Sequence, residues 1–386
     1  MRKSLLLFFT FLSPLFLKAQ NPEDGYYRVH NLGSERYVSI TDNTGSINYQ
    51  AMTADFGALQ LWKNHSRTVS DPATVVYLRK KGVDSGGPYY NLQSQGTGIY
   101  EIINKNIYLY YSDGSYQLYA EGKYLCDNET TDIDRGYMGI DRKGNYRRWL
   151  ADRIDIGSDE WFGITPSIEC NGRFFHPFYA DFGFIPVAEG MKVWYVSRVE
   201  TEAAIISELD AGLIPARVPL IIECGSQSVS DNKIDLRYSY AAGPAGNKLK
   251  GVYFNNPNRP KSVDSRKVFD SNTMRVLGTM SDGNLGYVLS NAPVDTKTQK
   301  QYLAANQSYL IVEPGMPDEI PVMTEREYQK FLEDRQNASV KAVAGENRYP
   351  VYMISGRKVG DLNDSQLSEL PAGIYIVGNR KYIVGE

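Results

Sequence analysis

Short runs of alternating apolar and polar residues, separated by glycine-rich turns, characterise the first third of the chain. Gly25–Asn31 alternates in this way, and a turn at 33–34 leads to a second run at 36–40. Similar runs recur within 75–92 and 107–125. This alternation puts every second side chain on one face and predicts β-strands. Three loosely spaced blocks of such strands predict a pseudo-threefold β architecture.

The rest of the chain continues the strand pattern, with one helical interruption. Eight runs rich in β-branched and aromatic residues lie within 159–323 and predict a β-sandwich or barrel, with Pro321 ending the β region. Thr324 and Glu327 then have the spacing of a capping box, which predicts a helix over 324–337. We therefore expect an all-β protein with domains at 20–158 and 159–323, a helix and small-residue linker at 324–347 (the linker from 338), and a β tail at 348–386.

The N-terminus has the anatomy of a secretory signal peptide. Two basic residues precede an apolar run at 4–17, and Ala19 offers a cleavage point. Removing 1–19 takes away three basic residues, so 39 of 42 remain against 45 acidic ones, a formal net charge of −6. This charge, without a Lys/Arg cluster, excludes a nucleic-acid partner, and no apolar run predicts a membrane span in the mature protein. We expect a secreted or outer-membrane surface-associated protein after cleavage near Ala19.

Tyrosine is unusually frequent, with 29 residues against 14 Phe and 4 Trp. Sugar sites stack pyranose rings on exposed Tyr or Trp and bind hydroxyl groups with Asn or Gln. The alternative is that these residues are core or ordinary exposed strand positions. The candidate ligand-binding residues are Gln60, Trp62, Tyr89, Tyr90, Asn91, Tyr108, Tyr110, Tyr116 and Tyr119.

Three stretches resemble known families. The opening GYYRVHNLGSERYVSI and the Q-x-W motif at 60–62 resemble a ricin-type β-trefoil repeat, although Trp149 lacks the Gln of that motif and the middle repeat has no such motif. This resemblance implies a β-trefoil-like domain and carbohydrate binding, with the motif's Trp mainly a core residue. The ordered segments from FGITPSI to YLAANQSYLIV resemble a β-sandwich module of secreted Bacteroidetes proteins. The pattern VYxxxGRxV…LPxGIYIV resembles a shortened C-terminal sorting domain of type IX secretion substrates, which implies the export machinery as a partner of the tail.

The three cysteines allow at most one intramolecular disulfide. Cys170 and Cys224 both end strand-like runs and form the candidate pair. The alternative is that all three cysteines, Cys126 included, are small buried residues. No Cys/His spacing indicates zinc, and we expect no metal and no cofactor.

Catalytic motifs are sparse. The segment 83–88, VDSGGP, resembles the nucleophile motif of trypsin-like serine proteases. Too few mature residues precede Ser85 for the barrel that presents the catalytic His and Asp, so we interpret the segment as a loop between strands. His176 lies among aromatic residues and is interpreted as a structural histidine. We expect no enzyme, but an exported binding protein for glycan or glycoprotein at the cell surface. The alternatives are a structural or adhesive surface protein that binds host or sister proteins, and a hydrolase assembled from distant residues.

Overall fold

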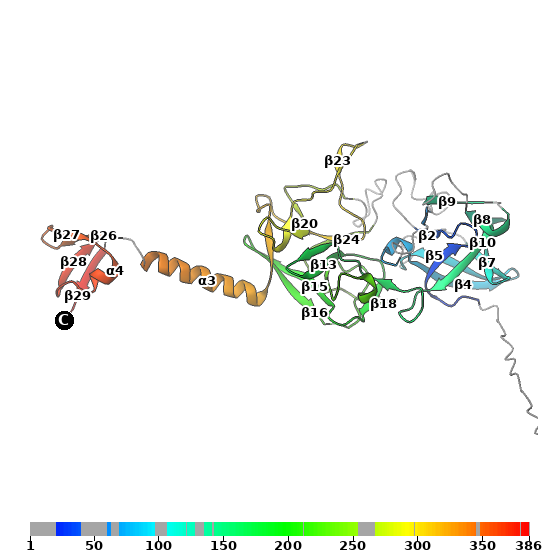
Figure 1. The fold of residues 1–386 in the computed structure, drawn as a ribbon, viewed down its shortest axis with the longest axis horizontal. Helices are drawn as coiled ribbons and strands as arrows, with labels where there is room; N and C mark the ends of the chain where they lie inside the picture. Colours follow the sequence, from blue (N-terminus) through cyan, green and yellow to red (C-terminus); the bar gives the residue numbers. More distant parts are fainter. Residues whose placement is uncertain are drawn as a thin grey trace, which may run out of the picture. The chain divides into compact units, whose positions relative to one another are not determined.

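The computed structural model describes residues 21–39, 60–62, 69–96, 106–120, 122–127, 135–140, 143–210, 212–253, 267–296, 298–344, 348–378 and 380–385. The signal peptide predicted over 1–19 lies outside these residues. The chain divides into two compact units, Met1–Val322 and Met323–Glu386. Strands make up most of the secondary structure in the described residues, so the all-β prediction is confirmed (Figure 1).

The first region of unit 1 is a closed barrel of antiparallel strands. Six strands pair in a ring in the order β1, β4, β5, β6, β7, β10 and back to β1. Ring closure leaves none of these six strands with an unpaired edge. The described strands of the region are β1 (Gly25–Asn31), β2 (Tyr37–Ser39), β3 (Gln60–Trp62), β4 (Val76–Asp84), β5 (Gly87–Ser94), β6 (Ile107–Ser112), β7 (Ser115–Ala120), β8 (Lys123–Asp127), β9 (Arg135–Ile140) and β10 (Arg148–Arg153).

The remaining four strands of this region form pairs inserted between barrel strands. β2 pairs with β3 between β1 and β4 along the chain, and β8 pairs with β9 between β7 and β10. The two pairs also join each other through β3 and β9. This is trefoil-like connectivity, and the corresponding stretch between β5 and β6, 97–105, lies outside the described residues. Two 3-10 turns, η2 (Pro72–Thr74) and η3 (Gly144–Arg147), connect strands here.

Apolar side chains at alternate strand positions fill the barrel. Val29, Leu92, Leu109 and Leu118 belong to one buried cluster, which also contains Trp149. Trp149 is fully buried, and its indole Nε1 donates a hydrogen bond to the Leu125 carbonyl oxygen at 3.0 Å. The tryptophan of the last repeat is therefore a core residue of the barrel.

The second region of unit 1 is built on a ten-stranded antiparallel sheet that curls back on itself. Its strand order places β12 and β13 at one end and β20, β24 and β19 at the other, and these ends lie against each other. The two faces enclose a core that includes Trp194, Leu277 and Tyr287. The sheet consists of β12 (Ile168–Cys170), β13 (Arg173–Phe178), β17 (Leu220–Cys224), β15 (Lys192–Val199), β16 (Ala204–Leu209), β25 (Ile320–Thr324), β21 (Leu285–Val288), β20 (Met274–Thr279), β24 (Gln307–Ile311) and β19 (Leu249–Val252).

Smaller elements complete this region, and one boundary differs from the prediction. Pro321 lies inside β25 opposite Gly286 instead of ending the β structure, because the strand continues to the Thr324 helix cap. The smaller elements are β11 (Phe162–Gly163), β18 (Lys233–Arg237) and β14 (Gly183–Pro186) in a three-stranded sheet, the pair β22 (Val294–Asp295) and β23 (Lys300–Gln301), and η4 (Val229–Asp231).

The two β regions of unit 1 share their hydrophobic cores. Tyr179 and Tyr253 of the second region belong to the barrel cluster, whereas Tyr26 and Tyr77 of the first region belong to a cluster made mostly of second-region residues. The Tyr253 hydroxyl also donates to the Ser94 carbonyl oxygen at 3.0 Å. The barrel and the curled sheet are therefore parts of one compact unit.

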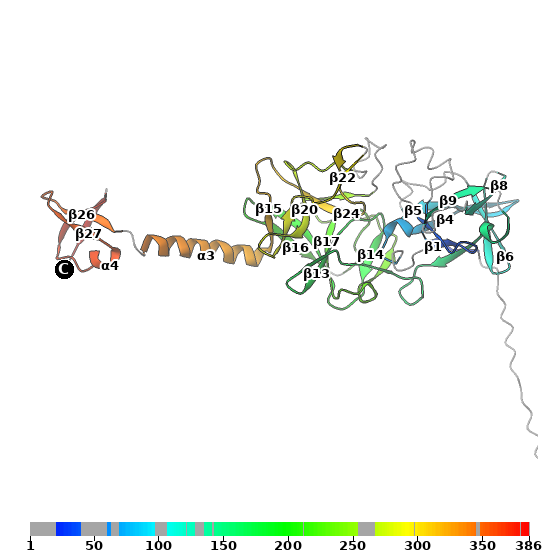
Figure 2. The same cartoon turned by 45° about the horizontal axis from the view of Figure 1, so that its top comes forward.

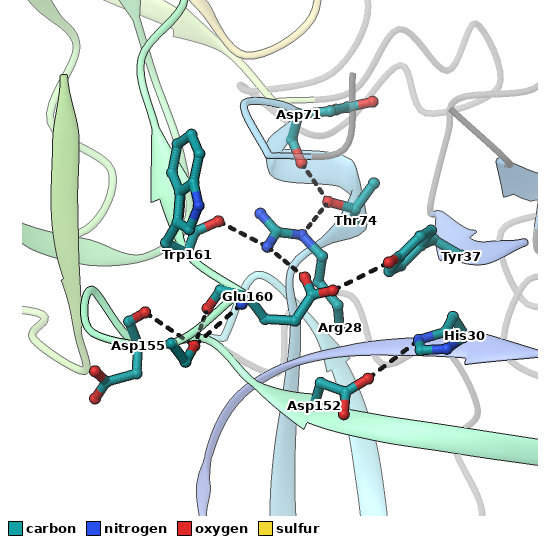
Figure 3. Close-up of polar contacts among 10 residues, drawn as sticks. Arg28, His30, Tyr37, Asp71, Thr74, Asp152, Asp155, Glu160 and Trp161 are labelled. Atoms are coloured by element: carbon teal, nitrogen blue, oxygen red, sulfur yellow. Dashed lines mark hydrogen bonds and ion pairs between the residues drawn. The ribbon is translucent and has the colours of Figure 1, made fainter. Parts of the chain in front are cut away.

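A buried arginine joins the two regions (Figure 3). The Arg28 side chain leaves β1 and is fully buried. Its Nη1 donates to Glu160 Oε2 at 3.0 Å and to the Trp161 carbonyl oxygen at 2.7 Å, while the Tyr37 hydroxyl donates to Glu160 Oε1 at 3.0 Å. Burial lowers the pKa of the Arg28 guanidinium, and the Glu160 carboxylate opposes this shift. One carboxylate thus satisfies donors from β1 and β2 at the start of the second region.

Unit 2 contains a helix and a small sheet. α3 (Glu325–Ala344) begins after Thr324, whose hydroxyl accepts a hydrogen bond from the Glu327 amide at 3.3 Å, so the predicted cap is confirmed. The helix extends to Ala344, into the segment expected to be a linker from residue 338, because Ala and Lys are good helix formers. Neither helix in the described residues combines the length and apolarity needed to cross a membrane.

The tail of unit 2 forms the predicted strands (Figure 2). They pair in the order β27, β26, β28, β29, and Val351 and Tyr375 are buried beneath them with Leu367. The short helix among them was not predicted, although Asn363 and Gln366 form its capping box. The elements are β26 (Tyr349–Met353), β27 (Lys358–Leu362), α4 (Asp364–Leu367), β28 (Gly373–Val377) and β29 (Arg380–Val384).

The candidate disulfide between Cys170 and Cys224 is not formed, and all three cysteines are buried and in the thiol form. Cys170 pairs with Arg173, whereas Cys224 pairs with Phe174, so the two cysteines lie on opposite sides of β13. Neighbouring residues of a strand point to opposite faces, and two strand spacings are about 10 Å, beyond the reach of a disulfide. The two thiols accordingly belong to different core clusters.

Removing the carboxylate that pairs with Arg28 should destabilise unit 1. Glu160→Gln leaves a buried guanidinium without its counter-charge, and breaking such a pair costs about 3–5 kcal/mol. Equilibrium urea unfolding measures the change in free energy. Glu23→Gln is the matched control, because Glu23 pairs with Arg153 in an exposed ion pair and its loss should cost less than about 1 kcal/mol. Equal effects of the two substitutions would contradict this role of Arg28.

Candidate functional site: a tyrosine ladder on the barrel

Four tyrosines lie in one row across four neighbouring strands of the barrel region. Tyr89 on β5 is the direct partner of Tyr108 on β6, Tyr108 of Tyr119 on β7, and Tyr119 of Tyr124 on β8. The ring centroids of successive tyrosines are 6.0, 6.3 and 4.9 Å apart. Tyr110 lies two residues along β6, nearly parallel to Tyr108 at 6.0 Å. We call these five residues the tyrosine ladder.

The strand alternation explains why the ladder is on the outside of the barrel. Ile107, Leu109 and Leu118 point into the barrel core, so the tyrosines beside them point outward. Successive rings are inclined by 57–62°; the first two pairs are tilted, and Tyr119 and Tyr124 meet edge to face, an arrangement that is favourable between aromatic rings. Tyr110 is 37% exposed. The ladder is therefore a braced aromatic strip at the surface.

Two glycines give the rings their space. A Cβ atom at Gly82 would lie 2.5 Å from the Tyr89 hydroxyl oxygen, and one at Gly86 would lie 3.0 Å from Cε1 of Tyr108. Gly82 is the cross-strand partner of Tyr89. The Tyr89 ring thus occupies the space that a side chain at position 82 would need.

Charged residues of opposite sign flank the ladder. On β6, the second strand of the row, the Tyr108 hydroxyl donates to Asp84 Oδ2 at 2.6 Å, and this bond raises the pKa of Tyr108 to about 12. At the β8 end of the row, the Arg147 guanidinium lies 4.4 Å from the centroid of the Tyr124 ring, a cation–π contact. The hydroxyl groups of the other four ladder tyrosines have no hydrogen-bond partner among the described residues.

The structure brings together only part of the predicted ligand-binding set. Tyr89, Tyr108, Tyr110 and Tyr119 are in the ladder. Tyr90 is fully buried in the barrel core and Asn91 is buried, so these two are not surface residues. Tyr116 is half-buried against that core, outside the ladder, and lines a cleft of about 260 Å³. Gln60 and Trp62 lie on β3, and their side chains are outside what the structure describes.

Sequence reasoning missed Tyr124, Asp84 and Arg147. Glu121-Gly122 is a turn signal between two strand-like runs, and a two-residue turn places Tyr119 opposite Tyr124, so the sequence contained a signal for Tyr124. Arg147 is far along the chain from Tyr124, and its position depends on β8 lying beside η3. Ser85 lies in the turn between β4 and β5, which confirms the loop interpretation of the VDSGGP segment.

The histidine with aromatic neighbours does not join a catalytic group in the described residues. His176 lies on β13, and burial lowers the pKa of its imidazole to about 4. Its Nδ1 has no hydrogen-bond partner among those residues. Asp181, by contrast, accepts a hydrogen bond from Arg217 Nε at 2.7 Å. Among the described residues, His176 and Asp181 are therefore not hydrogen-bonded to each other.

Comparison with known proteins adds little to this description. No protein-family model matches the sequence, and no curated protein matches it. One similar solved structure is the Rhizoctonia solani agglutinin, at 9% identity and a TM-score of 0.18, covering 35% of this chain and 99% of that one. Another is a mosquitocidal holotoxin, at 8% identity and a TM-score of 0.26, covering 78% of this chain and 45% of that one. Similarities this low carry no argument about fold or function.

The Asp84–Tyr108 hydrogen bond should be visible in the titration of one tyrosine. Below about pH 10, the usual tyrosine pKa, Tyr108 is protonated and the bond contributes fully to stability; this contribution is lost as the pH rises through about 12. In Asp84→Asn we expect the pKa of Tyr108 to fall towards about 10. NMR of protein labelled at tyrosine Cζ follows this titration. Asp113→Asn, at an exposed turn of the same barrel, should leave it unchanged, and an unchanged titration in Asp84→Asn would contradict the assignment.

Proposed function

We propose that this protein is an exported, non-enzymatic binding protein that recognises glycan or glycoprotein at the cell surface through the tyrosine ladder. The observation that carries the proposal is the row of outward rings with four hydroxyl groups unpartnered in the described residues. Aromatic rings offer apolar faces to the C–H groups of a sugar, and phenol hydroxyls exchange hydrogen bonds with its hydroxyl groups. Both kinds of contact are available on one strip.

The rigidity of the strip supports recognition. Each ring is in contact with a neighbouring ring, and a tyrosine has only two side-chain torsions to fix. Little conformational entropy is lost when such rings bind a ligand, because their positions are already set. This matters for sugars, since their individual contacts are weak.

Substituting two ladder tyrosines should abolish most of the binding. Each ring is expected to contribute about 1 kcal/mol, so Tyr110→Ala combined with Tyr119→Ala should weaken affinity roughly 30-fold. A glycan array identifies the ligand, and titration calorimetry measures the change. Tyr238→Ala is the matched control, because Tyr238 is 48% exposed but lies in the second region.

The array also separates the alternatives. Glycan binding that the control retains and the double variant loses would support the proposal. No glycan binding, together with capture of a protein from outer-membrane extracts that the double variant leaves unchanged, would instead favour a structural or adhesive surface protein.

The export route is a separate part of the proposal. We expect the mature N-terminus to begin after Ala19 and the tail at 348–386 to direct the protein to the surface through a type IX system. In a Bacteroidetes host, mass spectrometry gives the N-terminus, and protease treatment of intact cells measures surface exposure. Deleting 348–386 should trap the protein in the periplasm. Equal surface exposure with and without the tail would contradict this role.

A further inference from the structure

The direction of the tyrosine ladder limits the shape of its ligand. The four tyrosines that pair directly across strands lie in β5, β6, β7 and β8, so the row runs perpendicular to the strands. Three strand spacings amount to about 14 Å, which exceeds the size of one sugar ring. Each step of the row is close to the distance between successive sugars of an extended chain. A single sugar can therefore contact only part of the ladder.

The ladder lies on the outward face of its strands, apart from the clefts described in unit 1. Clefts of about 540, 360 and 260 Å³ occur in the described residues of unit 1, and no ladder residue lines any of them. Pockets enclose a small ligand or the end of a chain on several sides, whereas a strip open at both ends accepts the middle of a chain. The shape of the site favours internal segments.

The charge of the strip favours an uncharged chain. Two charged groups of opposite sign contact ladder rings, the Asp84 carboxylate at Tyr108 and the Arg147 guanidinium at Tyr124. Between them, neutral phenols line the surface. The Asp84 carboxylate would repel a sulfated or uronic-acid chain, and the Arg147 guanidinium would attract it. These two interactions oppose each other, so they give an anionic chain no net attraction.

We propose that the tyrosine ladder binds an internal segment of a linear, neutral polysaccharide, with three or four consecutive sugars lying across β5 to β8. This inference rests on the proposed glycan-binding function and specifies the ligand class of the same site. Adjacent strands of a sheet are rotated by about 20–25° relative to each other, so a ligand that crosses four strands is a free chain that can twist with them.

Affinity as a function of chain length tests this inference. Titration calorimetry with cello- and xylo-oligosaccharides of one to six units uses the full mature chain. We expect affinity to rise at least about tenfold from two to four units and to change less than about twofold from four to six. Tyr89→Ala and Tyr124→Ala each shorten the ladder at one end, so each should flatten the rise after three units. Tyr238→Ala should keep the wild-type profile.

The outcomes distinguish the inference from the proposed function. A monosaccharide that binds as tightly as the tetrasaccharide, with binding lost in the ladder variants, would overturn the inference and leave the proposed function standing. The same holds if array glycans bind through the ladder but every neutral linear chain fails. No glycan binding in either experiment would overturn both. Circular dichroism checks the fold, and since the two shortened variants alter opposite ends, failure of one to fold leaves the other as the test.

Discussion

The guanidinium of Arg28 links the barrel to the second region of unit 1 through buried hydrogen bonds. It leaves β1, the strand that pairs with β2, β4 and β10, and thereby belongs to the ring that closes the barrel. Its partners Glu160 and Trp161 begin the second region. A buried charge is tolerated only when it is paired and hydrogen-bonded, so barrel closure and the docking of the second region constrain each other. The outward face of β5 to β8 depends on the same closed ring.

Much of the fold follows from local sequence. The tail strands and their turns, the Thr324 cap and the hairpin around Ser85 are encoded by neighbouring residues, because turn and cap chemistry is short-range. The end of α3 was misjudged because small residues at 338–344 fit a linker and a helix equally well by composition. The pairing of β3 with β9 and the sharing of cores between the two regions involve residues far apart in sequence, which local patterns do not specify.

The candidate site shows the same division. Alternation alone indicates that one of Tyr89 and Tyr90 points inward, but only barrel closure decides that Tyr90 is the core residue. The row itself requires the register of four strands, and a shift by one residue would turn each ring to the other face. Asp84 and Arg147 enter through tertiary contacts that no spacing in the sequence reveals. Composition identified tyrosine as the relevant residue type, and topology selected which tyrosines form a surface.

The arrangement of the cysteines determines how sensitive the folded protein is to oxidation. Cys170 and Cys224 face opposite sides of their sheet, and burial raises the pKa of the Cys224 thiol to about 12. A protonated, buried thiol is a poor nucleophile and a poor target for oxidants. The native state therefore makes no use of covalent cross-links among its three cysteines. We therefore expect the stability of the folded protein to be the same under reducing and oxidising conditions.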